Sequence, residues 1–124
     1  MTTAQLQNRG KYWQKLLRLQ DWDVTFEFAG AMELDGAVGR NAYNLKQKSS
    51  YIKICIPKEN TDSYIPNRSI DLTILHELLH LHLTPLFKKE VSRFEDSAQE
   101  SSIDLIAQAI LTAHEYHPKT SRKK

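Results

Sequence analysis

The segment Asp71-Leu-Thr-Ile-Leu-His-Glu-Leu-Leu-His-Leu-His-Leu83 predicts the central element of the fold, a buried helix. Its leucine and isoleucine residues cover nearly every direction around a helix axis, and a helix that is apolar all round is buried. Ser69 is a suitable N-cap, and Pro85 disfavours helical backbone at the residue before it. We therefore predict a helix from Ser69 to about Leu83.

Two histidines and a glutamate lie on one side of this apolar segment. His76 and His80 are four residues apart, so on a helix they lie on one face and can present two imidazoles to one metal ion. Glu77, about 100° around the helix from His76, can reach a water at the metal without ligating it. This His-Glu-x-x-His arrangement is typical of zinc hydrolases, in which zinc lowers the pKa of water and a carboxylate accepts its proton. His82 lies about 200° from His80 and is predicted to be structural.

The burial of these polar groups supports a metal site. An unpaired charge inside a protein costs several kcal/mol, so the two histidines and Glu77 need partners. A metal ion supplies them. The alternative is a core helix whose histidines make ordinary hydrogen bonds.

A second helix, from Ser92 or Ser97 to about His114, offers a third ligand. Its apolar stripe has i, i+3, i+4 spacing and consists of Ile103, Ile106, Ala107, Ile110 and Leu111. Glu100 and Asp104 fall on or beside this stripe, where a carboxylate needs an explanation, and Glu100 is the candidate ligand. Other candidates for the third position remain open: Glu90, Glu95, His114 and His117.

Together these residues carry a family resemblance. His76-Glu77-x-x-His80 followed by Glu100-Ser-Ser-Ile-Asp104 resembles the gluzincin group of zincin metallopeptidases. The resemblance implies that Glu100 ligates zinc and that Asp104 orients a ligand histidine through its other ring nitrogen. The chain also resembles small proteins of phages and mobile elements that carry such a motif.

The remaining sequence predicts a helix and a small sheet. Apolar spacing predicts an N-terminal helix over Thr3–Leu19, and alternation predicts strands over Asp21–Phe28 and Tyr51–Ile56. Asn41–Lys46 is expected to pair with the last of these. The predicted class is α+β: a minimal zincin-like domain with an N-terminal helix, a small, mostly antiparallel sheet, the buried histidine helix and a C-terminal helix.

The resemblance also implies a substrate strand. In zincins a strand near the active helix receives an extended peptide as an added strand. The resemblance implies that Tyr51–Ile56 is this strand, with Tyr51, Lys53 and Cys55 facing outward. Tyr51 and Lys53 are then the expected substrate-binding residues. An ordinary sheet strand is the alternative. Cys55 as a metal ligand, as in peptide deformylases, lacks the surrounding signature. The donor to the oxyanion is left open among four residues: Tyr43, Tyr51, Tyr64 and His117.

Composition limits the class of protein. A chain of 124 residues suits a single domain, predicted over 1–117 with a basic disordered tail over 118–124. The net charge of +2 is too small to predict a nucleic-acid partner. No apolar run is long enough for a membrane span, and the single cysteine forms no internal disulfide, so a cytoplasmic protein is expected.

The functional prediction is a zinc metallopeptidase that acts on a peptide or protein substrate. Glu77 is its general base, and His76, His80 and Glu100 hold zinc. Two alternatives stay open. One is a non-catalytic interaction module stabilised by zinc, and the other is a different zinc hydrolase, such as a ribonuclease that uses His82 or His114 as its third ligand.

Overall fold

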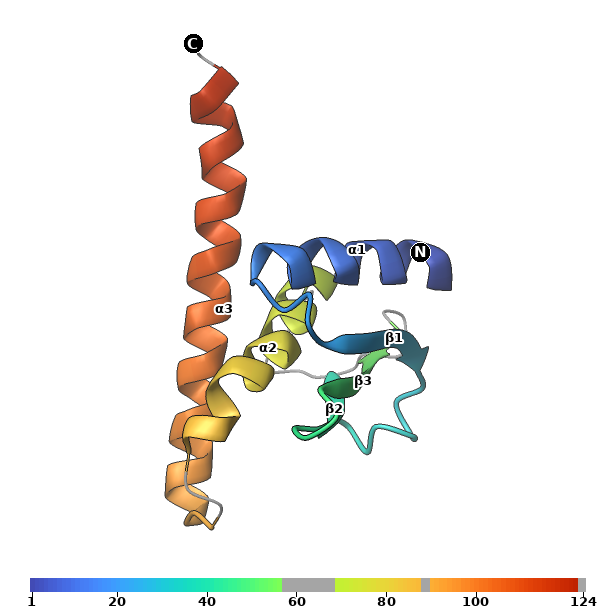
Figure 1. The fold of residues 1–124 in the computed structure, drawn as a ribbon, viewed down its shortest axis with the longest axis vertical. Helices are drawn as coiled ribbons and strands as arrows, with labels where there is room; N and C mark the ends of the chain where they lie inside the picture. The colour runs from blue at the N-terminus through green and yellow to red at the C-terminus, as the bar shows by residue number, and fades with distance from the viewer. Residues whose placement is uncertain (57–68, 88–89, 123–124) are drawn as a thin grey trace.

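The computed structural model of the chain describes residues 1–56, 69–87 and 90–122, with side chains described as far as Glu115. Three α-helices and a three-stranded sheet are present in these ranges, so the predicted α+β class is confirmed (Figure 1). In chain order the elements are α1 (Thr3–Leu16), β1 (Asp23–Ala29), β2 (Gly39–Asn44), β3 (Ser49–Cys55), α2 (Ile70–Leu83), the 3-10 helix η2 (Thr84–Leu86) and α3 (Arg93–Arg122).

The sheet has the order β1-β3-β2, with β3 in the centre. β3 pairs antiparallel with β2, which confirms the predicted pairing, and parallel with β1, so the sheet is mixed rather than mostly antiparallel. The parallel register joins the most apolar segments, with Phe26 opposite Ile52 and Phe28 opposite Ile54. The strand with the most buried aliphatic side chains thereby takes the central position.

α2 occupies the middle of the molecule. It contacts α1, α3, β2 and β3, and in Figure 1 it runs diagonally between the sheet and the long α3. Ser69 caps it by accepting a hydrogen bond from the Leu72 amide at 3.0 Å, so the predicted start is confirmed, and the helix ends at Leu83 as expected. Its apolar residues are buried in one core with side chains of α1, the sheet and α3.

A polar clamp joins the first turn of α2 to α1. Asp71 accepts two hydrogen bonds from the Arg9 guanidinium, at 2.7 and 2.9 Å, and a third from Trp13 Nε1 at 2.8 Å. Trp13 is buried, and so is Trp22. An aspartate in the first turn also interacts favourably with the helix dipole, so this contact stabilises the start of α2 and its docking together.

Two helix ends differ from prediction. α1 ends at Leu16 rather than Leu19, because Arg18 takes a left-handed conformation (φ 61°) that reverses the chain. The buried Gln14 amide then donates to the carbonyls of Leu19 and Trp22. α3 continues to Arg122, beyond the predicted end near His114 and through residues 118–122 that were assigned to a disordered tail. No helix in the described ranges is both long and apolar enough to cross a membrane.

The contact between α1 and β1 gives a test of the fold. Gly10 is buried in α1, and a Cβ added there would lie 2.5 Å from the Phe26 ring. Alanine favours a helix by up to about 1 kcal/mol over glycine, but overpacking costs about 1–3 kcal/mol. We therefore expect Gly10→Ala to lower the free energy of unfolding, measured by urea denaturation with a chelator present.

The matched control is Asn8→Ala, at an exposed position of the same helix. It should leave stability unchanged or raise it slightly, because only helix propensity acts there. Equal stabilisation by both substitutions would contradict the close packing of α1 on Phe26.

Candidate metal centre

The side chains of His76 and His80 lie where α2 faces α3, and Glu77 between them in sequence lies beside β2. The side chains of His76 and His80 are 12% and 18% exposed, and Glu77 as a whole residue is 7% exposed. The apolar residues of α2 take the other directions and fix this polar side toward α3. The helix therefore aims its two imidazoles at one place.

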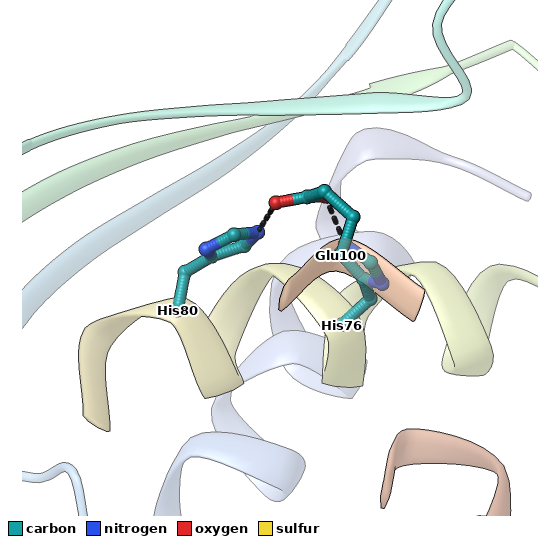
Figure 2. Close-up of side chains that lie close together, drawn as sticks. All are labelled: His76, His80 and Glu100. Carbon is teal, nitrogen blue, oxygen red and sulfur yellow. Dashed lines mark hydrogen bonds and ion pairs between the residues drawn. The ribbon is translucent and has the colours of Figure 1, made fainter. Parts of the chain in front are cut away.

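Glu100 of α3 meets both histidines there (Figure 2). Its Oε1 lies 3.0 Å from Nε2 of His76, and its Oε2 lies 3.1 Å from Nε2 of His80. One possible ligand atom from each residue falls within 4.8 Å of the others, so the three form a group that could hold a metal ion. The structure thus brings together the three residues that the sequence predicted as ligands.

Each histidine has a second partner at Nδ1. His76 Nδ1 lies 3.0 Å from Asp104 Oδ1, as the resemblance implied, and His80 Nδ1 lies 2.8 Å from Thr84 Oγ1. Asp104 is itself held by Gln108, whose amide donates to its other oxygen at 3.0 Å. A partner at Nδ1 fixes the ring orientation and turns Nε2 toward Glu100, which is the usual support for a histidine that ligates through Nε2. Thr84 is a site residue that was not predicted, although its i, i+4 spacing from His80 is a signal for this contact.

The ionisable groups of the cluster shift one another's pKa values. Burial lowers the pKa of His76, whereas the hydrogen bond with Glu100 and the negative charge of Glu77 raise it. With a further hydrogen bond to Asp104 the raising effects win, and the pKa lies above its ordinary value of 6.5. Hydrogen bonds from His76 and then His80 hold the pKa of Glu100 well below its usual range. The cluster therefore favours positive charge between its carboxylates.

A divalent cation would supply that charge. Two imidazole nitrogens and one carboxylate are a ligand set that catalytic zinc sites use, with a further position left for water or substrate. Glu100 is 46% exposed in its side chain, so the group is open on one side. The residues present therefore fit zinc.

A cleft of about 370 Å³ adjoins this open side. Glu77, His80 and Glu100 line it together with residues of the edge strand β2, of the connection between α2 and α3 and of the first turns of α3. The further lining residues are Gly39, Asn41, Tyr43, Thr84, Phe87, Val91, Asp96 and Gln99. A molecule in the cleft therefore reaches Glu77 and two of the three candidate ligands at once.

The other candidate ligands whose side chains are described lie away from the group. His82 Nε2 lies 2.7 Å from the Leu17 carbonyl, in agreement with its predicted structural role, and His114 Nε2 lies 2.9 Å from the Tyr12 hydroxyl. Glu95 forms reciprocal hydrogen bonds with Ser92 at the start of α3. Glu90 is exposed and is not part of the group. The side chains of Tyr64 and His117 lie outside the described residues.

The expectation that β3 receives an added strand is wrong. β3 is central and paired on both edges, so its backbone hydrogen bonds are already used. Tyr51 and Lys53 do not line the cleft: Tyr51 donates to Glu27 at 2.5 Å, and Lys53 pairs with Glu33. Cys55 is buried rather than outward, because it packs in a small second cluster with Ala29 and Leu34.

Chemically, the arrangement suits hydrolysis. Two imidazoles and a carboxylate converge, and a further carboxylate, Glu77, lies at the wall of an open cleft beside them. Comparisons with protein-family models, with curated proteins and with solved structures found no match to this chain. Function is therefore inferred from the motif and the geometry of this site.

The partners at Nδ1 can be tested by zinc affinity. We expect Asp104→Asn and Thr84→Val each to weaken zinc binding by about 10–100-fold, because Asn accepts a weaker hydrogen bond from the imidazole than a carboxylate does and Val accepts none. Competition with a chromophoric chelator measures the affinity. His82→Ala serves as the control and should bind zinc like wild type, since its ring contacts Leu17 instead. Weaker binding only in His82→Ala would contradict the assigned site.

Proposed function

We propose that this protein is a zinc-dependent metallopeptidase of the gluzincin-like zincin type. The observation that carries the proposal is the convergence of His76, His80 and Glu100 from two helices beside a cleft that Glu77 also lines. In this proposal the three converging residues hold zinc. Zinc, when bound, supplies Lewis acidity that lowers the pKa of water and polarises a carbonyl group.

Glu77 is the general base of the proposed reaction. Glu77 is 7% exposed and lines the cleft. Its carboxylate is therefore largely shielded from bulk water but accessible to a substrate bound in the cleft. It accepts a proton from the attacking water and returns it to the leaving amine as the peptide bond breaks. Asp104 and Thr84 hold the two imidazoles in orientation throughout, since each contacts an Nδ1 atom.

The edge strand β2, rather than β3, is the proposed binding site for an extended peptide. Within residues 1–56, 69–87 and 90–122, β2 pairs along one edge only, and Gly39, Asn41 and Tyr43 at alternate positions line the cleft. A free strand edge offers backbone hydrogen bonds to an extended chain. Of the tyrosines considered as oxyanion donors, Tyr43 lines the cleft and Tyr51 does not. The peptide or protein substrate and a cytoplasmic location remain predictions.

The alternatives receive less support. A structural zinc site is normally closed by four protein ligands. Among the described residues the group contains three, and it opens onto a cleft. A ribonuclease that uses His82 or His114 as a ligand would need those rings at the site, whereas they contact Leu17 and Tyr12.

Replacing the base tests the proposal. We expect Glu77→Gln to retain zinc but to lose about 10²–10⁴-fold in hydrolysis of denatured casein and of a mixed fluorogenic peptide library, because the amide cannot accept the proton. Zinc content is measured on the same samples by mass spectrometry.

Glu115→Gln is the matched control for this variant. Glu115 is exposed on α3, away from the cleft, so the same chemical change there should leave hydrolysis at the wild-type rate. Full activity of zinc-loaded Glu77→Gln would show that the assigned mechanism is wrong.

A further inference from the structure

The side chain of Asn41 connects the edge strand β2 to the residue proposed as the base. Its Nδ2 donates a hydrogen bond to the backbone carbonyl of Glu77 at 2.8 Å. Within a helix this carbonyl normally accepts one bond from the amide four residues later, and its second lone pair is available. Asn41 therefore ties β2 to α2 without breaking the helical hydrogen bond.

Ser50 fixes the orientation of the Asn41 amide. The Ser50 hydroxyl, on the neighbouring strand β3, donates to Asn41 Oδ1 at 2.6 Å, and Ser50 is 5% exposed. Because Oδ1 accepts from Ser50, the amino group points toward α2. The three groups form one chain of hydrogen bonds from β3 through β2 to the Glu77 carbonyl.

Gly39 brings the backbone of β2 close to the Glu77 carboxylate. A Cβ at Gly39 would lie 2.7 Å from Thr73 Cγ2 and 3.3 Å from Glu77 Oε2. Only a residue without a side chain allows this approach. The Glu77 carboxylate therefore packs against β2 at Gly39, and two residues further along β2, Asn41 bonds to α2.

We infer that Asn41 is a positioning residue for Glu77, acting with Ser50 and Gly39 to hold the carboxylate at the wall of the cleft. The inference rests on the proposed function of Glu77 as general base. Because β2 is also the edge proposed to hold the substrate, the same contacts set the distance between the base and the bond that is cleaved. A displacement of about 1 Å in such an arrangement costs about 100-fold in rate.

Kinetics of the zinc-loaded full chain give the first measurement. Asn41→Ala should lower kcat by about 10–100-fold while KM stays within about twofold, because the base moves and the strand edge remains. Zinc content should equal that of wild type, since no candidate ligand is touched. The double variant Asn41→Ala/Ser50→Ala should be no worse than Asn41→Ala, because both substitutions break one hydrogen-bonded chain.

Asn44→Ala is the matched control. Asn44 lies exposed on the same strand, and its Oδ1 accepts from the Gln47 amide in the turn that follows. If Asn44→Ala lost as much kcat as Asn41→Ala, the loss would come from a general weakening of β2 and not from the contact between Asn41 and Glu77. That result would overturn the inference.

Nuclear Overhauser contacts supply a measurement that needs no activity. In the metal-free chain, the α protons of Gly39 should show a strong contact to the Thr73 methyl group, and this contact should weaken in Asn41→Ala but not in Asn44→Ala. If Asn41→Ala does not fold, Ser50→Ala should show the same weakening to a smaller degree. An unchanged contact in the folded Asn41→Ala variant, or in Ser50→Ala where Asn41→Ala is unfolded, would overturn the inference.

The two measurements separate the inference from the proposed function. If zinc-loaded wild type cleaves neither casein nor the peptide library, the proposed function fails, and the contact between Gly39 and Thr73 alone decides whether Asn41 holds β2 against α2.

Discussion

The contact of Glu100 with His76 and His80 is the interaction on which the candidate site depends. It lies between α2, at the centre of the molecule, and α3, which packs along one side (Figure 1). Apolar residues of α3, among them Ile103 and Ala107, are fully buried beside it. Charged groups at such a place are costly unless they are paired, so the packing of α3 and the electrostatics of the cluster constrain each other.

Because of this constraint, each residue of the site is held by further contacts. His76 is held by Glu100 at one ring nitrogen and by Asp104 at the other, and His80 has Thr84 in the corresponding place. On the opposite side, β2 packs against Glu77 through Asn41. The cleft is therefore formed by three elements that each contact α2, namely β2, η2 and α3. The apolar side chains of α2 pack in the core and fix the helix on its remaining sides.

Most of the part of the site formed by α2 and α3 could be predicted from the sequence, and little of the part formed by β2 could. The helix from Ser69 and the position of Glu100 followed from caps and from apolar spacing, which are local signals. The central position of β3 could not be predicted from such local signals. Strand order depends on the path of residues 30–38, which place β2 beyond β3 instead of next to β1. Asn41 escaped notice for a related reason: its partner is a backbone carbonyl distant in sequence, and no residue pattern marks such a contact. Tyr51 and Lys53 belong to the strand that is central in the sheet, and neither lines the cleft.

Zinc stoichiometry tests the central claim most directly. The metal content of purified wild type and Glu100→Ala should be measured side by side by mass spectrometry, after zinc has been added back and excess removed. The account predicts about one zinc per chain in wild type, as in a three-ligand catalytic site, and much less in the variant. No zinc in wild type, or equal zinc in both proteins, would contradict a site formed by His76, His80 and Glu100.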